Sequence, residues 1–120
     1  MGIPVGAGTD ATRVASYNPW VSLYWMVAGK TVGGTELYPE TNRLDRMEAL
    51  RRYTLGSAWF AKDEARRGSL EPGKLADLTV LDQDYLTMPV EEIARLQSLL
   101  TIVGGKIVYA AGPFTDLEEK

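Results

Sequence analysis

The sequence of 120 residues contains no histidine and no cysteine. A Ser-His-Asp triad, a cysteine nucleophile and a disulfide framework are therefore excluded. Zinc sites in proteins usually need histidine or cysteine, and catalytic zinc sites typically need three protein ligands. From the residues alone we expect no metal site and no cofactor site within this chain.

Basic charge and long apolar runs are also scarce. The net charge is −3 and the isoelectric point is near 4.9, so no basic stripe for nucleic acid is expected. The most apolar window, residues 20–28, is far shorter than the roughly 20 residues that a membrane span needs. No signal peptide is recognised, and the absence of cysteine fits a reducing compartment. We expect a cytoplasmic chain whose partners are neither nucleic acid nor membrane.

The N-terminal zone begins with an apolar stretch that runs through glycines to Asp10. Since α/β enzymes often place catalytic groups at the carboxyl end of a buried strand, Asp10 is the candidate catalytic residue. The alternative is a turn aspartate that accepts backbone N–H bonds. Pro19 suits the first turn of a helix, and apolar residues follow it at helical spacing. In that helix Trp20, Tyr24 and Trp25 belong either to the core or to an aromatic wall around a substrate.

The middle zone predicts two helices. Asp45 caps the first helix, and Glu48 stands three residues later in a capping-box arrangement. Thr54 is expected to cap the second helix, which Gly68 ends. The residues expected to face the core from the two helices are Leu44, Met47, Leu50, Leu55, Ala58 and Trp59.

The C-terminal zone carries turn and strand signals. Pro72-Gly73 suits a type II turn, and residues 78–81 have the composition of a strand. A short helix is expected within residues 89–96. The tail from Gly112 is polar, so we expect it to be loose.

A hairpin is predicted within the same zone, over LLTIVGGKIVYAAG. Gly104-Gly105 provides a two-residue turn, for which glycine is favoured because such turns need positive φ angles. This register places Ile102 opposite Ile107 and Leu100 opposite Tyr109.

Two C-terminal segments, GSLEPGKLADLTVLD and TIVGGKIVYAAG, resemble the C-terminal end of amidohydrolase-superfamily enzymes. The similarity is strongest to amidohydrolase family 3, which includes N-substituted formamide deformylases. It extends upstream through EALRRYTLGSAWFAKDEARRGSLEPGKLADL and back to GAGTDA and NPW, so it covers nearly the whole chain. The GSLEPGKLADL string is the specific part of this resemblance.

Enzymes of this family are much longer, and they combine a metal-binding (β/α)₈ barrel with a small β-sandwich. The resemblance implies that residues 3–9 match the eighth barrel strand, and that Asp10 matches the aspartate that contacts the metal or activates metal-bound water. Residues 1–67 would then hold the last barrel strand and the C-terminal helices, residues 68–111 the sandwich strands, and residues 112–120 a polar tail. A divalent metal such as zinc is implied for full-length members, whose His-X-His motif and other metal ligands this chain lacks.

These observations predict one α+β domain over residues 1–120, with helices packed on a small antiparallel sheet. A lone barrel strand and an uncovered sheet face favour association, so we expect a homo-oligomer through residues 3–8 or 20–28. Two functional hypotheses follow. In the first, the chain is a C-terminal amidohydrolase fragment that is not catalytic alone and acts at most through self-association. In the second, it is one part of a split amidohydrolase that hydrolyses C–N bonds of amides when a complementing chain supplies the histidines.

Overall fold

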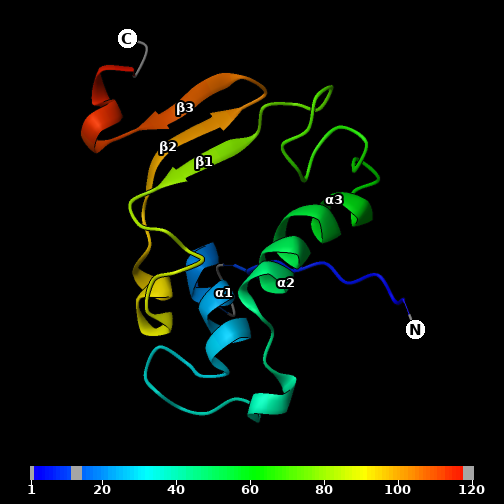
Figure 1. Ribbon diagram of the computed structural model, residues 1–120, viewed down its shortest axis with the longest axis vertical. Coiled ribbons are helices and arrows are strands. Elements are labelled where there is room, and N and C mark those ends of the chain that lie inside the picture. Colours follow the sequence, from blue (N-terminus) through cyan, green and yellow to red (C-terminus); the bar gives the residue numbers. More distant parts are fainter. Residues whose placement is uncertain (1, 12–14, 118–120) are drawn as a thin grey trace.

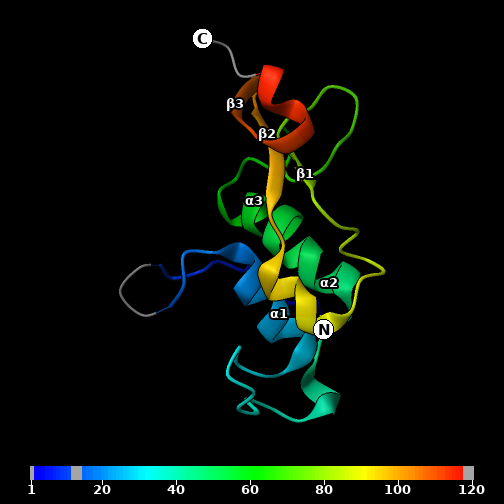
Figure 2. The same ribbon diagram turned by 90° about the vertical axis from the view of Figure 1, so that its left-hand side faces the viewer.

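A computed structural model describes residues 2–11 and 15–117, which fold into a helical layer and a small sheet (Figure 1). The sheet lies at one end of the molecule with the helices beneath it, as Figure 1 and Figure 2 show, and in Figure 1 the N-terminal segment extends past the helices to one side. The predicted α+β class is confirmed. The helices and strands are α1 (Pro19–Ala28), α2 (Arg46–Arg51), α3 (Ser57–Phe60), β1 (Leu78–Leu81), β2 (Ser98–Val103) and β3 (Lys106–Ala110), with a π-helical turn at Arg52–Gly56 and 3₁₀-helices at Glu40–Asn42, Val90–Arg95 and Gly112–Leu117. Within the described part of the chain, no helix is long and apolar enough to cross a membrane.

The helix α1 forms as predicted because both of its ends are capped. Asn18 Oδ1 accepts a hydrogen bond from the Trp20 N–H at 2.9 Å, and the first helical residue is a proline. Gly29 ends the helix with a φ of 66°. The helix packs against α2 and against the 3₁₀-helix that precedes β2, and its Leu23 is fully buried.

The predicted pair of helices is one continuous helical stretch that runs from α2 through the π-helical turn into α3. Asp45 caps this stretch as predicted, since its Oδ1 accepts a hydrogen bond from the Glu48 N–H at 2.8 Å. The predicted cap at Thr54 is wrong. Thr54 lies inside the stretch, and its hydroxyl donates to the Leu50 carbonyl at 2.9 Å.

The same stretch ends at Phe60, earlier than predicted, and Lys62 then takes a positive φ of 55°. Ala58 is buried as predicted, but Leu55 and Trp59 are 38% and 48% exposed. The π-helical turn has a wider spacing than 3.6 residues, so it rotates the residues after it away from the predicted apolar face. Periodicity alone could not predict this rotation.

The core lies where α1, α2 and the segment before β2 meet. Ile93 of that segment is fully buried. In α2 the fully buried position belongs to Ala49, whereas Met47, which was predicted to face the core, is 46% exposed. A small side chain at this position lets the helix backbone approach its neighbours closely.

Hydrogen bonds tie α2 to the segment after β1. The Arg46 guanidinium donates to the carbonyls of Tyr85 and Met88, the second at 2.6 Å. The Tyr85 hydroxyl donates back to the Arg46 carbonyl at 3.0 Å. These reciprocal bonds fix the sheet-bearing half of the chain to the helical half.

The turns of the C-terminal half confirm the prediction. Gly104 and Gly105 form the two-residue hairpin turn with φ of 58° and 81°. Gly73 has a φ of 92°, and the Lys74 N–H donates to the Glu71 carbonyl at 3.1 Å across the predicted Pro-Gly turn. The strand β1 and the short helix before β2 also lie where the sequence predicted them.

The three strands form one antiparallel sheet in the order β1-β2-β3. Ile102 pairs with Ile107 as predicted. The predicted pairing of Leu100 with Tyr109 is wrong. The register shifts between Thr101 and Ile102, so Leu100 pairs with Ala110 instead. Such a bulge inserts one unpaired residue and turns the following side chains to the other face.

The two ends of the chain differ from the prediction. Residues 2–10 form irregular chain rather than the predicted strand at residues 3–9. A strand needs a neighbour that completes its backbone hydrogen bonds, and within the described residues this segment lies against a helix instead. The tail that was predicted to be loose forms the 3₁₀-helix Gly112–Leu117 against β2 and β3.

Candidate functional site

Asp10 lines a hollow of about 460 Å³ between the N-terminal segment and the helical layer, which we call the Asp10 hollow. Residues 6–10 form one wall, and α1, the loop after it and the π-helical turn form the others. The lining is mainly apolar with a few polar groups, as is typical of small-molecule sites. Its side chains from the helical layer and the loop are Ser22, Trp25, Met26, Leu37, Tyr38 and Tyr53.

One face of α1 builds the helical wall. Ser22, Trp25 and Met26 are three and four residues apart, so they lie on the same side of the helix. Tyr24 points into the core, where it is buried, and Trp20 also packs against the core. Trp25 packs against the core as well, and of the three aromatic residues it is the one that also lines the same hollow as Asp10.

The N-terminal wall is fixed to the π-helical turn by backbone contacts. The Ala7 N–H donates to the Arg52 carbonyl at 3.0 Å, and the Ser57 hydroxyl donates to the Ala7 carbonyl at 2.7 Å. Gly56 allows this close approach, because a Cβ atom on it would lie 2.3 Å from the Val5 oxygen. These contacts hold the N-terminal wall of the hollow in place against the π-helical turn.

Asp10 itself is exposed and has a positive φ of 49°. Aspartate and asparagine adopt this left-handed conformation more readily than other non-glycine residues. Beside it, Thr9 Oγ1 accepts a hydrogen bond from the Ala11 N–H at 3.3 Å. The local turn thus presents the carboxylate at the solvent side of the hollow.

Two buried polar groups belong to residues of the same lining. Trp25 Nε1 and the Tyr53 hydroxyl are shielded from solvent and have no hydrogen-bond partner among the described residues. The Tyr38 hydroxyl, by contrast, donates to the Trp25 carbonyl. Burial raises the pKa of Tyr38, and the charge of Arg43 opposes that shift. The side chains of Trp25 and Tyr53 therefore line the hollow with their apolar atoms, and Asp10 supplies its carboxylate.

Tyr38 and Tyr53 were not among the predicted site residues. Tyr38 lies in an irregular loop, and Tyr53 lies in the π-helical turn that helical spacing did not reveal. Neither position carries a local motif, so the sequence held no signal that could have found them.

The described residues do not fit a metal of the kind that the family resemblance implies. The sequence has no histidine or cysteine, and within residues 2–11 and 15–117 no three His, Cys, Asp or Glu side chains gather closely enough to hold an ion. A catalytic zinc typically needs three such protein ligands. Asp10 is therefore an isolated carboxylate within the described structure.

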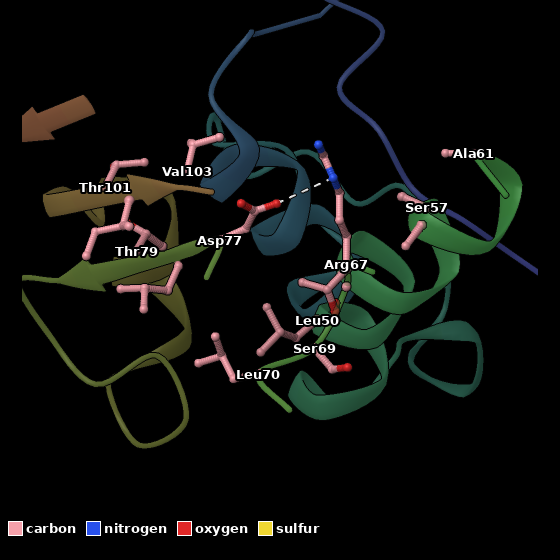
Figure 3. Close-up of a pocket in the computed structure, with 15 residues that line it drawn as sticks. Leu50, Ser57, Ala61, Arg67, Ser69, Leu70, Asp77, Thr79, Thr101 and Val103 are labelled. Atoms are coloured by element: carbon pink, nitrogen blue, oxygen red, sulfur yellow. Dashed lines mark hydrogen bonds and ion pairs between the residues drawn. The ribbon is translucent and has the colours of Figure 1, made fainter. Parts of the chain in front are cut away.

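A second and larger hollow, of about 730 Å³, separates the sheet from the helical stretch, and we call it the sheet hollow. Figure 3 shows Thr79, Thr101 and Val103 on its strand side, with Leu50 and Leu70 between the strands and the helix. Its lining is also mainly apolar.

The charged groups of the sheet hollow have partners. Arg67 lies 2.9 Å from the Asp63 carboxylate and 3.7 Å from the Asp77 carboxylate, and Figure 3 marks the second pair. Asp77 Oδ1 also accepts a hydrogen bond from the Gly104 N–H at 2.6 Å. These groups hold the hairpin turn to the loop after α3, which is a structural role.

Comparison with known proteins supports the family resemblance. An N-substituted formamide deformylase of Arthrobacter pascens is 34% identical over 108 residues, which cover 90% of this chain and 20% of that protein. A protein of Bacillus subtilis (strain 168) named as an amidohydrolase, YtcJ, is 36% identical over 72 residues, which cover 60% of this chain and 14% of that protein. No solved structure matches the chain.

The chain therefore spans a fifth or less of the length of these two relatives. The sequence pattern of the amidohydrolase family matches residues 1–109, which is nearly the whole chain. On this match, and on the relatives that accompany it, the chain belongs to the amidohydrolase family.

Proposed function

We propose that this chain is the aspartate-bearing C-terminal part of a metal-dependent hydrolase that acts on C–N bonds of amides, and that residues 1–120 alone do not catalyse the reaction. The observation that carries the proposal is the Asp10 hollow, in which an aspartate within the family-matched residues lines a mainly apolar site, without a set of metal ligands among the described residues. Asp10 would act as a general base only beside groups that other sequence supplies.

The exposed N-terminal segment supports this proposal. Ile3 is 74% exposed and Val5 is 44% exposed, although both are strand-forming apolar residues. An unpaired segment of this kind is suited to joining the edge of another sheet. A complementing stretch of amidohydrolase sequence, whether in the same chain or in another, would add strands beside residues 3–9 and bring metal ligands toward Asp10.

A chimeric enzyme tests the proposal. This chain replaces the matching C-terminal fifth of the Arthrobacter pascens deformylase, and release of formate from N-butylformamide is measured. We expect activity that Asp10→Asn lowers by at least about 100-fold, the lower range for loss of a general base. Asp116→Asn, which changes an exposed aspartate of the last 3₁₀-helix, is the control and should leave the activity unchanged.

A folded, zinc-loaded chimera whose activity survives Asp10→Asn would contradict the role of Asp10. Zinc content and circular dichroism of both variants establish that the comparison is made between folded proteins. Activity of the isolated chain at the level of the chimera would contradict the need for further sequence.

Self-association is the second candidate, and a surface around Phe60 favours it. Phe60 is 58% exposed and packs edge to face against Trp59, with ring centroids 5.0 Å apart. Its ring lies 2.9 Å from where a Cβ atom on Gly6 would stand, so it adjoins the segment that exposes Val5. The helix α1 is largely covered by the rest of the chain, which leaves this N-terminal surface as the interface that we propose.

Light scattering tests the self-association. We expect a mass of at least twice 13.2 kDa at micromolar concentration, and Val5→Glu should return the chain to a monomer. Val108→Glu is the control, because Val108 is 59% exposed on β3, away from this surface. A monomer mass that does not change with concentration would contradict the proposal.

A further inference from the structure

We propose that Ser57, the first residue of α3, is a positioning residue for Asp10. Its hydroxyl holds the N-terminal segment against the helical stretch, so that the Asp10 carboxylate keeps its place at the Asp10 hollow. The part that this plays in catalysis rests on the proposed function, in which Asp10 is the general base. Ser57 does not line the Asp10 hollow, so it acts through Asp10 and not on a ligand.

The first argument is that both backbone polar groups of Ala7 are bonded to the helical stretch. The Ala7 N–H donates to the Arg52 carbonyl at 3.0 Å, and the Ala7 carbonyl accepts the Ser57 hydroxyl at 2.7 Å. The same hydroxyl lies 3.1 Å from the Arg52 carbonyl, so the Ala7 carbonyl is the nearer acceptor. Figure 3 shows Ser57 beside the path of the N-terminal segment. Ala7 is therefore a fixed point of that segment.

The second argument is the shape of the helix at this contact. π-helical turns are rare and often occur at functional sites. The turn ends at Gly56, which has a φ of −61° that any residue adopts. The backbone angle therefore does not require glycine here, but the contact does. A Cβ atom on Gly56 would lie 2.3 Å from the Val5 oxygen and 3.2 Å from the Gly6 Cα. The helical stretch is thus shaped to receive the segment that leads to Asp10.

The third argument is that Asp10 lies between two fixed points of the backbone. Ala7 stands three residues before it, and the bridge between Ala11 and Ala15 follows it directly. Three residues span at most about 10 Å when fully extended, so a shift at Ala7 reaches Asp10 with little slack. Asp10 is exposed, so its place depends on the backbone that carries it rather than on the packing of its side chain.

Kinetic constants of the chimeric deformylase test the role in catalysis. We expect Ser57→Ala to lower kcat for N-butylformamide about tenfold and to leave KM within about twofold, because a misplaced base slows only the chemical step. Gly56→Ala, whose Cβ atom would displace the Val5 oxygen, should lower kcat at least as much. Thr54→Val is the matched control and should leave kcat unchanged. The Thr54 hydroxyl donates to the Leu50 carbonyl within the helical stretch, not to the N-terminal segment.

A double variant separates positioning from a general loss of structure. If Ser57 acts through Asp10, Ser57→Ala has no further effect on kcat in a chimera that already carries Asp10→Asn, because residues that act as a unit are not additive. A merely structural role would lower kcat by the same factor in both backgrounds, and that result would overturn the proposal. A kcat that Ser57→Ala leaves unchanged, or a rise in KM alone, would overturn it too.

Backbone ¹⁵N order parameters of the isolated chain test the anchoring without reference to hydrolysis. We expect Ser57→Ala to lower the value at Asp10 toward that of flexible chain, below about 0.6, and Thr54→Val to leave it unchanged. An equal value at Asp10 in the parent and in Ser57→Ala would overturn the proposal. A lower value together with an inactive, folded, zinc-loaded chimera would reject the proposed hydrolase and retain the anchor. An active chimera that needs Asp10 and is indifferent to Ser57→Ala would do the reverse.

Discussion

The Asp10 hollow and the sheet hollow are both lined mainly by apolar side chains, yet their polar groups are in opposite states. In the sheet hollow, Arg67 and Asp77 bind each other and the neighbouring chain. In the Asp10 hollow, Trp25 and Tyr53 carry buried donors without partners in the described structure. Volume alone would favour the sheet hollow as a binding site. The exposed carboxylate of Asp10 favours the smaller one, because the charged groups of the sheet hollow, Arg67 and Asp77, already pair with each other.

Substitutions in the hairpin turn beside the sheet hollow should cause the largest change in stability. Replacing Gly104 and Gly105 by valine forces two β-branched residues into positive φ, at about 1–2 kcal/mol each. We expect the free energy of unfolding in urea to fall by roughly 2–4 kcal/mol. Gly33→Val is the control, because this loop glycine has no positive φ and a Cβ atom there would make only an ordinary contact, 3.8 Å from Thr31 Oγ1. Equal denaturation midpoints for the parent and the double variant would contradict the turn.

The contribution of Tyr85, which is buried in the core, to the free energy of unfolding should depend on pH. Burial raises its pKa to about 12, whereas the unfolded chain has the ordinary value near 10. The neutral phenol is favoured in the folded state, so its contribution to stability is complete below pH 10 and is lost as the pH rises through 12.

We therefore expect the free energy of unfolding to fall on the order of 1–2 kcal/mol between pH 10 and pH 12. Tyr85→Phe should be less stable at neutral pH, because it loses the bond to the Arg46 carbonyl, and its stability should change less across this interval. A parent curve that is flat to pH 12, or identical curves for the two proteins, would refute this assignment.

The two aspartates give a direct comparison of the hollows. Asp77→Ala removes the acceptor for the Gly104 N–H and a partner of Arg67, so we expect about 1–2 kcal/mol of destabilisation. Asp10→Asn removes the exposed negative charge and keeps a residue that tolerates the positive φ, so it should change the free energy of unfolding by less than about 0.5 kcal/mol. Thermal unfolding measures both. A larger effect at Asp10 than at Asp77 would reverse the roles assigned to the two hollows.

The most local expected effect concerns the wall that carries Asp10. Ser57→Ala removes the hydrogen bond to the Ala7 carbonyl, which is worth about 1 kcal/mol. We expect faster hydrogen exchange at the Ala7 amide and easier proteolysis within residues 2–10. Ser69→Ala, at the sheet hollow, is the control and should not alter exchange at Ala7. Unchanged exchange in the Ser57 variant would show that this bond does not hold the segment.

The elements that the sequence predicted well are those whose cause is local. Pro19 at a helix start, Asp45 as a cap and Gly104-Gly105 as a turn each act through neighbouring backbone, and all three lie where they were expected. The strand at residues 3–9 was wrong, because a strand depends on a partner that local sequence does not specify.

The site was predictable only in part, for the same reason. Asp10 was named from its place after an apolar stretch and from the family resemblance. Trp25 was named as one of three aromatic residues that either pack in the core or line a substrate. Tyr53 reaches the hollow from the π-helical turn, and Tyr38 from an irregular loop. A change of helical period and a loop path depend on tertiary packing, which a single sequence does not state.

The proposed function depends most on Asp10 having no metal site of its own among the described residues. The direct test is zinc analysis of the isolated chain after dialysis, together with an assay of formate release from N-butylformamide. We expect far less than one zinc per chain and no release above the uncatalysed rate, because three ligands are needed and histidine and cysteine are absent. Near-stoichiometric zinc, with formate release that Asp10→Ala abolishes, would contradict the proposed function.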